Sequence, residues 1–277
     1  MSDQATDLRN LVMQSVRDDA PLPHLPRPRF IVLSGGKGGV GVTTLAVNLA
    51  VAMGELGSRV VLVDADLYRA DVAVLCGLSE RHSVADVIAA RRDIHEMLER
   101  GPAGIQVVPG LWAPGTFADC QDMAQRRLIQ QFASLGKHAD FIVLDTGSGV
   151  NQVVQRFWQA ADEILLVTTP DTVSVMDTYA TIKTLHSEDS QTTLSLMVNR
   201  CARQVIADDV QGRINRACQH FLGVSTVCAG FVPEDQQVSD ATHHRIPFVS
   251  QRGVAASAIQ QLAGRMMEGK DHVARAA

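Results

Sequence analysis

A glycine-rich segment offers the clearest chemistry in this chain of 277 residues. An apolar run, FIVLS at 30–34, leads into GGKGGVGVTT at 35–44, and helical periodicity begins near Thr43. A strand, a glycine turn and a helix start together present free backbone N–H groups and a positive dipole end to an anion. Glycines let the backbone approach such an anion closely. The segment therefore predicts a phosphate-type site, and a glycine turn without a ligand is the alternative.

The spacing of the segment fits most of the phosphate-loop template G-x-x-x-x-G-K-[ST]. Gly36, Gly41 and Thr43 occupy template positions, whereas Val42 stands where the template has lysine. A charge-assisted contact from that lysine contributes about 1.5–3 kcal/mol. Its absence is expected to weaken nucleotide binding about 10- to 100-fold. It also removes charge stabilisation from phosphoryl transfer, so we expect slow or absent turnover.

Aspartates follow two further apolar runs. RVVLVD at 59–64 ends at Asp64, and Asp66 lies two residues on, so both carboxylates face one side of an extended segment. DFIVLD at 140–145 ends at Asp145, and an aspartate that closes a buried strand needs a ligand or hydrogen bonds to offset its desolvation. Carboxylates in these places could hold magnesium or orient a water. A solvated pair at a strand end is the alternative for Asp64 and Asp66.

Short apolar runs alternate with stretches of helical period along most of the chain. Further runs cover 105–109, 163–169, 194–199 and 225–232, and helical stretches include 43–56, 83–98 and 125–135. Continuous apolar strands indicate burial on both faces, and alternation with helices indicates βαβ units. We therefore expect an α/β fold, with a doubly wound, mostly parallel sheet and helices on both faces. Ligands of such sheets bind beyond the carboxyl ends of the strands.

Composition and charge exclude several classes of protein. The 30 acidic and 25 basic residues give a formal charge of −5, which argues against a general nucleic-acid surface. Five cysteines without a C-x-x-C pair are typical of a reduced protein with buried thiols. No apolar run approaches the roughly 18 residues of a membrane span, and MSDQATDLRN is no secretory signal. We expect a cytoplasmic protein, with the cell pole or the inner-membrane surface as further places.

The early lysine of the glycine segment carries a resemblance to a known family. With Lys37 in the run KGGVG-x-TT, the sequence resembles the deviant-Walker family of P-loop proteins, which contains MinD, ParA, the nitrogenase iron protein and the FlhG group. Asp64-Ala65-Asp66 looks like the first switch of that family, and Asp145 stands at its Walker B position. The family commonly reads D-x-P-x-G there, whereas this chain has Gly147 in place of the proline.

The resemblance implies a weak Mg²⁺-dependent ATPase that forms an ATP-dependent homodimer. Lys37 would reach the nucleotide of the partner subunit and Asp66 would act on the attacking water, which makes these two the catalytic candidates. Magnesium would be held by Thr43, with Asp64 and Asp145 as linked carboxylates. Nucleotide contacts would come from Gly36, Lys37, Gly38, Gly39, Val40, Gly41, Val42, Thr43, Thr44, Asn199, Arg200, Pro233 and Glu234. Among these, Asn199 and the loop around Pro233 would hold the adenine base.

The first 20 residues narrow the resemblance. DQATDLR at 3–9 looks like the D-Q-A-x-x-L-R arm of FlhG proteins, also called YlxH or FleN. That arm stimulates the flagellar GTPase FlhF, so Gln4, Leu8 and Arg9 would contact this partner, and a helix packed on its own domain is the alternative. The prolines of PLPHLPRPR predict an extended tether. The expected organisation is an arm at 1–20, a tether at 21–29, a MinD-like domain at 30–268 and a tail at 269–277.

The C-terminal segment differs from the amphipathic membrane-targeting helix usual in MinD and FlhG proteins. Ile259, Leu262 and Met266 are expected to pack on the core, and the tail after them has no apolar face. Membrane docking is therefore not expected.

These features together predict a MinD-like ATP-binding switch that regulates flagellar number or placement, with FlhF and flagellar switch or regulatory proteins as partners. One alternative is a catalytically impaired nucleotide-binding scaffold that only recruits partners. Another is a septum-placement or pilus-localisation ATPase of the same family. A DNA-partitioning role is less expected, because the chain lacks a basic tract.

Overall fold

The computed structural model describes residues 27–66, 69–78, 86–87, 91–110, 122–187 and 192–274. The strands are β1 Arg29–Gly35, β2 Val60–Asp64, β3 Glu99–Arg100, β4 Gln106–Val108, β5 Phe141–Ser148, β6 Glu163–Thr168, β7 Thr193–Cys201 and β8 Val227–Pro233. The α-helices are α2 Val42–Glu55, α3 Val72–Leu75, α5 Asp122–Ser134, α6 Gln152–Ala160, α7 Thr172–Ser187, α8 Gln204–Leu222, α9 Gln236–His243 and α10 Val254–Ala274. Short 3₁₀ turns cover Ile94–Met97, Pro102–Gly104, Leu135–Lys137 and Phe248–Ser250.

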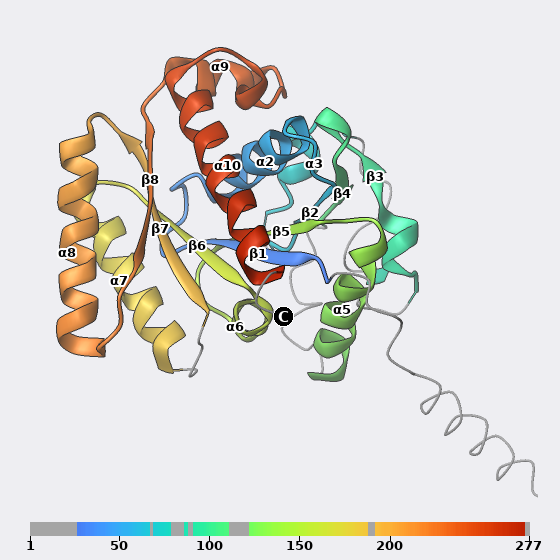
Figure 1. Cartoon of the computed structure of the whole chain (residues 1–277), viewed down its shortest axis with the longest axis horizontal. Helices are drawn as coiled ribbons and strands as arrows, with labels where there is room; N and C mark the ends of the chain where they lie inside the picture. Colours follow the sequence, from blue (N-terminus) through green and yellow to red (C-terminus); the bar gives the residue numbers. More distant parts are fainter. Residues whose placement is uncertain are drawn as a thin grey trace, which may run out of the picture.

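All these strands join in one sheet with the order β3-β4-β2-β5-β1-β6-β7-β8. Every pairing is parallel except that of β3 with β4. Because β1 lies between β5 and β6, the order reverses at β1, and the glycine segment leaves the carboxyl end of this central strand (Figure 1). Open α/β sheets bind ligands at such a reversal. The expected doubly wound, mostly parallel sheet is confirmed.

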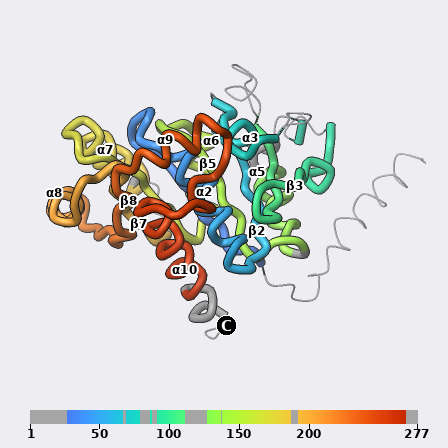
Figure 2. The backbone as a smooth tube through the Cα atoms, turned by 90° about the horizontal axis from the view of Figure 1, so that it is seen from above, coloured from blue at the N-terminus to red at the C-terminus, as the bar shows by residue number. Residues whose placement is uncertain are grey.

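Helices cover both faces of the sheet because successive strand residues point to opposite sides. In β1, Phe30 and Val32 belong to a core with α5, α6, α7 and α8. Ile31 and Leu33 belong to a second core with α2 and α10. Figure 2 shows the resulting arrangement from above, with α10 running along one side of the sheet. The two cores fix the carboxyl end of β1 from both sides.

The C-terminal helix packs on the domain as expected. Ile259, Leu262 and Met266 of α10 are all buried in the second core. The helix continues to Ala274. In the part of the chain that the structure describes, no helix is long and apolar enough to cross a membrane.

One local expectation is corrected, and one short strand is an addition. The continuous helix expected over 83–98 does not form, because residues 91–93 are not helical and Ile94–Met97 make a 3₁₀ turn. Asp93 starts this turn with an extended backbone, and its carboxylate accepts a hydrogen bond from His95 N at 2.9 Å. The antiparallel strand β3 was not expected, since two residues carry no periodic signal.

Among the described cysteines, Cys76, Cys201 and Cys218 are buried, whereas Cys228 is exposed.

Candidate functional site

The glycine segment forms a tight loop between β1 and α2. Gly41 is the residue before α2 and has φ of 96°, a left-handed conformation that glycine adopts without strain. A Cβ at Gly41 would lie 2.5 Å from Asn199 Nδ2, and one at Gly36 would lie 2.5 Å from the backbone of Asp177 in α7. No side chain caps the start of α2, and its first turn contains no acidic residue. The N–H groups of this first turn are therefore available to an anion.

Two buried carboxyl groups lie side by side beneath this loop. Asp64 ends β2 and is paired in register with Asp145 of β5, and the two are only 1% and 0% exposed. The oxygens of Asp64 accept hydrogen bonds from Asp66 N at 3.3 Å and from Val72 N at 3.2 Å. Burial, followed by the charge of Asp145, raises the pKa of Asp64 well above its ordinary value. Asp64 is thus held by backbone groups at both oxygens.

Asp145 keeps one oxygen available. Its Oδ1 accepts a hydrogen bond from Gly147 N at 3.0 Å, while its Oδ2 is buried and makes no standard hydrogen bond within the described residues. Burial raises the pKa of Asp145 to about 7, although hydrogen bonds from the Thr43 side chain and from Gly147 N lower this pKa. A divalent cation beside Thr43 would take this Asp145 oxygen as a ligand and offset the desolvation of its charge. Thr43 and Asp145 therefore fit Mg²⁺.

Asp66 lies against Gly147, two residues beyond Asp145. Its Oδ1 accepts a hydrogen bond from Arg69 N at 3.2 Å. A Cβ added to Gly147 would lie only 2.0 Å from Asp66 Oδ2, and Gly147 itself has φ of 61°. The Asp66 carboxyl thus occupies the space that a side chain at position 147 would need. The absence of a side chain at position 147 is what allows Asp66 to touch the end of β5 here.

Lys37 makes an ion pair within its own chain. Its Nζ lies 3.2 Å from Asp171 Oδ1, and both side chains are about half exposed. Asp171 also accepts hydrogen bonds from Thr169 Oγ1 and from Ser174 N, which lies in the first turn of α7. The hydrogen bond from Thr169, then those from Ser174 and Lys37, lower the pKa of Asp171 to about 2. The carboxylate is therefore ionised at neutral pH and holds Lys37 at the rim of the loop.

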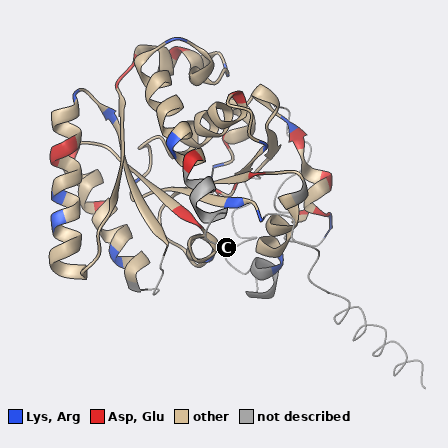
Figure 3. Ribbon diagram, in the orientation of Figure 1, with Lys and Arg blue, Asp and Glu red and all other residues tan. Residues whose placement is uncertain are grey.

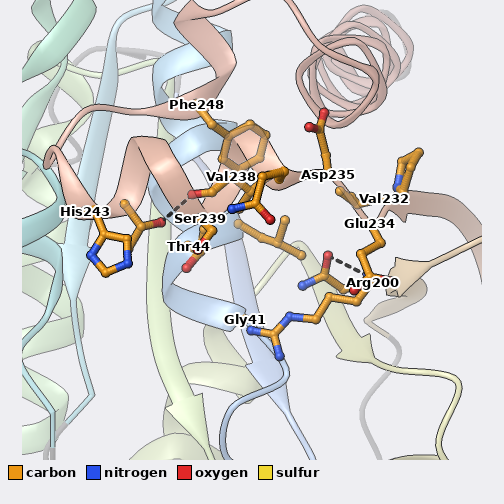
Figure 4. Close-up of a pocket in the computed structure, with 15 residues that line it drawn as sticks. Gly41, Thr44, Arg200, Val232, Glu234, Asp235, Val238, Ser239, His243 and Phe248 are labelled. Carbon is orange, nitrogen blue, oxygen red and sulfur yellow. Dashed lines mark hydrogen bonds between the residues drawn. The ribbon is translucent and has the colours of Figure 1, made fainter.

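Two adjoining cavities surround the loop. The loop cavity has a volume of about 420 Å³ and is lined by Lys37, Gly38, Gly39, Gly41, Val42, Thr43, Thr44, Asp66, Arg69, Asp71, Gly147, Ser148 and Arg200. The β8 cavity has a volume of about 480 Å³ and is lined by residues of α2, the ends of β7 and β8, α9 and Phe248. Gly41, Thr44 and Arg200 line both. Figure 4 shows these three among the residues of the β8 cavity. Together the cavities offer an anion-binding end and a less polar end of ligand size.

Comparisons with known proteins agree with this geometry. Residues 28–196 match the family model described as an AAA domain. The antiactivator FleN of Pseudomonas aeruginosa is 36% identical over 213 residues, which are 77% of this chain and 76% of FleN. The flagellum site-determining protein YlxH of Helicobacter pylori is 28% identical over 190 residues, which are 66% of this chain and 62% of YlxH. The cell division ATPase MinD of Pyrococcus furiosus has a TM-score of 0.73 at 25% identity, covering 87% of this chain and 98% of that structure.

The chain belongs to the MinD/ParA-type family of P-loop ATPases, close to FlhG.

Within this MinD/ParA-type chain, the structure brings most of the predicted nucleotide residues together. The glycine loop, Thr43, Thr44 and Asp66 line the loop cavity, and Asn199, Pro233 and Glu234 line the β8 cavity. Gly36 instead packs beneath α7, and Val40 is buried. Asp64 and Asp145 are buried and line neither cavity. Gln4, Leu8 and Arg9 lie outside the described residues.

Sequence reasoning missed several residues that line the cavities of this family member. Arg69 and Asp71 follow Asp66 on the same loop, so their place after a strand-end carboxylate could have indicated them. Ser148 follows Asp145 and Gly147 at the end of β5 in the same way. Residues of α9 and Phe248 line the β8 cavity without any sequence signal, because only the tertiary fold carries them there.

The replacement of the loop lysine in this family member is accommodated by packing. Val42 is only 5% exposed and belongs to the core beneath α2. A Cβ added to Gly35 would lie 2.8 Å from Val42 Cγ2, so this side chain lies directly over the end of β1. Val42 therefore contributes apolar contact at the place where the template has a cation.

Proposed function

We propose that this chain is an ATP-binding switch of the FlhG group that regulates flagellar number or placement. The observation that carries the proposal is the continuity of the two cavities, which share Gly41, Thr44 and Arg200. A nucleotide could place its phosphates at the uncapped start of α2 and its base beside Asn199 and Pro233. The similarity to FleN and YlxH supports the flagellar part of the proposal.

The residues of the site would divide the work as follows. Thr43 and Asp145 would hold Mg²⁺, and bound Mg²⁺ would neutralise phosphate charge. Asp64, whose oxygens are both engaged by backbone N–H groups, would position the switch rather than bind the metal directly. Asp66 would orient the attacking water from the loop cavity.

ATP would favour a homodimer through Lys37. In the single chain Lys37 is bound to Asp171, so it must leave this partner to reach a nucleotide in a second copy. A ligand shifts such an equilibrium only by its differential affinity for the two states. The contact of Lys37 with the partner subunit's nucleotide would supply that difference, and loss of the γ-phosphate would return the monomer.

The test is calorimetric titration with Mg·ATP and Mg·ADP combined with light scattering. We expect binding of both nucleotides and a dimer with ATP alone. Lys37→Ala should retain binding and lose the dimer, whereas Lys183→Ala, which removes an exposed lysine of α7 outside both cavities, should behave like the wild type. No binding of either nucleotide at millimolar concentration would exclude the switch.

A nucleotide-binding scaffold is a second candidate, and the burial of Val42 favours it. In this version the chain binds ATP and dimerises but does not hydrolyse it, because the loop lacks a cation at that position. Single-turnover measurements at high protein concentration separate the two. Phosphate release supports the ATPase, whereas dimerisation without phosphate release supports the scaffold.

The N-terminal arm would stimulate FlhF from the cytoplasm, at the cell pole or at the inner-membrane surface. Full-length Gln4→Ala and Arg9→Ala variants should lose the stimulation of GTP hydrolysis, and Gln14→Ala and Arg17→Ala serve as controls later in the arm. Full stimulation by the first pair would refute the role of the arm. It would then favour a septum-placement or pilus-localisation ATPase.

A nucleic-acid partner is not proposed. The long helix α8 at the edge of the molecule carries both acidic and basic positions (Figure 3). Asp208 and Asp209 share this helix with Arg213 and Arg216, and Arg213 lies 3.6 Å from Asp209 Oδ2. Such neighbouring opposite charges do not provide the single-signed surface that attracts a phosphate backbone.

A further inference from the structure

The loop cavity has no cation at the position where the phosphate-loop template has one. Val42 is buried among apolar side chains, and Lys37 is bound to Asp171 at the rim. A nucleoside triphosphate carries several negative charges, and hydrogen bonds from charged donors are about twice as strong as those from neutral ones. The remaining cations that line this cavity within the described residues are Arg69 and Arg200.

We propose that Arg200 supplies the phosphate-binding cation that the loop lacks at Val42. This inference rests on the proposed nucleotide-binding function. It gives Arg200 a phosphate contact, whereas its place beside Asn199 in the sequence had suggested the adenine end of the site. The side chain of Arg200 extends beside Gly41 at the start of α2, and it lines both cavities (Figure 4). It therefore lies where the two ends of a nucleotide would join.

The backbone of Arg200 is fixed relative to the loop by one buried side chain. Asn199 is 7% exposed; its Nδ2 donates to Val40 O at 2.7 Å, and its Oδ1 accepts from Arg200 N at 2.9 Å. This single amide thus joins the loop to the residue that carries the guanidinium. Arg200 also has φ of 52°, a left-handed conformation that is strained for a residue with a side chain. Such strain persists where the surrounding contacts impose it, and it is enriched at ligand sites.

The guanidinium of Arg200 is available for a ligand. Asp66, Asp71, Glu234 and Asp235 line one or other of the same cavities, but no ion pair joins Arg200 to an acidic group of the described residues. A planar guanidinium can donate two parallel hydrogen bonds to phosphate, which suits this role better than a point charge.

Arg69 is the rival cation, and the geometry favours Arg200. Arg69 lines the loop cavity but not the β8 cavity. Its backbone N–H is bound by Asp66, which belongs to the segment that resembles the first switch. Arg200 lies near the end of β7, and the buried Asn199 side chain joins it to the loop. A cation fixed in this way is preorganised for the phosphates.

The test compares full-length variants by calorimetry with Mg·ATP and Mg·AMP. We expect Arg200→Gln to weaken ATP binding about 10- to 100-fold and AMP binding much less. Val42→Lys should restore most of the loss in the double variant, because it returns a cation to the same phosphates. Arg200→Gly should lose the same affinity while it folds at least as stably, since glycine adopts the left-handed backbone without strain. Arg203→Gln, which removes a nearby arginine that lines neither cavity, is the matched control.

The outcomes separate this inference from the proposed function. Equal weakening of ATP and AMP binding in Arg200→Gln, without rescue by Val42→Lys, would place Arg200 at the base and overturn the inference. Loss and rescue in Arg69→Gln instead of Arg200→Gln would also overturn it and assign the cation to Arg69. Absence of nucleotide binding in both the wild type and Val42→Lys would instead refute the proposed function itself.

Discussion

Asn199 joins the end of β7 to the glycine loop through a hydrogen bond of 2.7 Å from its Nδ2 to the carbonyl oxygen of Val40. The two residues are 159 positions apart, so this contact sets the loop relative to the β8 cavity. The same amide accepts a hydrogen bond from Arg200 N. Any base contact by Asn199 must therefore use the hydrogen-bonding capacity that these two bonds leave.

Asn199→Ala should weaken both the fold and nucleotide binding. It leaves the carbonyl of Val40 and the N–H of Arg200 without their partner, which lowers the free energy of unfolding by about 1–3 kcal/mol. It also frees the loop, so ATP affinity should fall roughly tenfold or more. Asn215→Ala is the control, because Asn215 Oδ1 accepts a hydrogen bond from Thr226 N far from the cavities. Denaturation and calorimetry on both variants check the prediction, and wild-type affinity in Asn199→Ala would contradict it.

Gly147→Ala should disturb Asp66 more than backbone strain alone explains. The new Cβ would lie 2.0 Å from Asp66 Oδ2, so the carboxyl must move, and φ of 61° adds strain. Gly149→Ala is a matched control, because Gly149 has φ of 95° but no atom within 4 Å of the added Cβ. We expect both variants to be destabilised by about 1 kcal/mol or more. Single-turnover phosphate release should fall further only in Gly147→Ala, and equal rates in the two variants would argue against a role for the Asp66 position.

The buried Asp145 predicts a pH dependence of stability in the absence of nucleotide. Its pKa is raised from the ordinary 3.8 to about 7, chiefly by burial. A carboxyl with a raised pKa stabilises the fold most when it is protonated, below pH 3.8, and this contribution is lost as the pH rises toward 7. The free energy of unfolding should therefore fall across that window by more in the wild type than in Asp145→Asn. Asp209→Asn, which removes an exposed acid of α8, should follow the wild type.

Metal binding at Asp145 should release a proton near neutral pH. Mg²⁺ takes the ionised carboxylate, so Mg·ATP binding at pH 6.5 to 7 must displace the proton that burial retains. Calorimetry in two buffers of different ionisation enthalpy measures this release. A binding heat that does not depend on the buffer would show that Asp145 does not bind the metal. The Asp145→Asn variant is the reference, because it has no titrating group at this position.

The strands of the fold could be predicted from the sequence because they are apolar on both faces. FIVLS, RVVLVD and DFIVLD became β1, β2 and β5, and their strand-end aspartates lie at one edge of the sheet as expected. The prediction of a helix over 83–98 was wrong, although the apolar spacing fits one. Residues 91–93 are not helical, and Asp93 caps a 3₁₀ turn instead. Periodicity reports which side chains face the core, and it does not report where local hydrogen bonds end an element.

The candidate site was predictable where residues are adjacent in sequence and was missed where tertiary contact assembles it. The loop and Thr43 follow from spacing. Three contacts of the site join segments that are distant in sequence. They are the Asn199–Val40 hydrogen bond, the close approach of Asp66 to Gly147 and the Lys37–Asp171 ion pair. No pattern within one segment encodes such contacts, since each depends on the sheet order.

The Lys37–Asp171 ion pair predicts a variant with a stronger tendency to dimerise. Asp171→Asn removes the charge that holds Lys37, yet its side-chain oxygen can still accept the hydrogen bond from Ser174 N at the start of α7. Because the pair is half exposed, its loss should change the free energy of unfolding by only about 0–1 kcal/mol. A freed Lys37 should reach the partner subunit's nucleotide more readily, so the ATP-dependent dimer should form at a protein concentration several-fold lower. Light scattering across a dilution series measures this shift, with Lys37→Ala/Asp171→Asn as the control that should not dimerise. A dimer that forms equally in Asp171→Asn and the wild type would mean that this contact does not restrain the lysine.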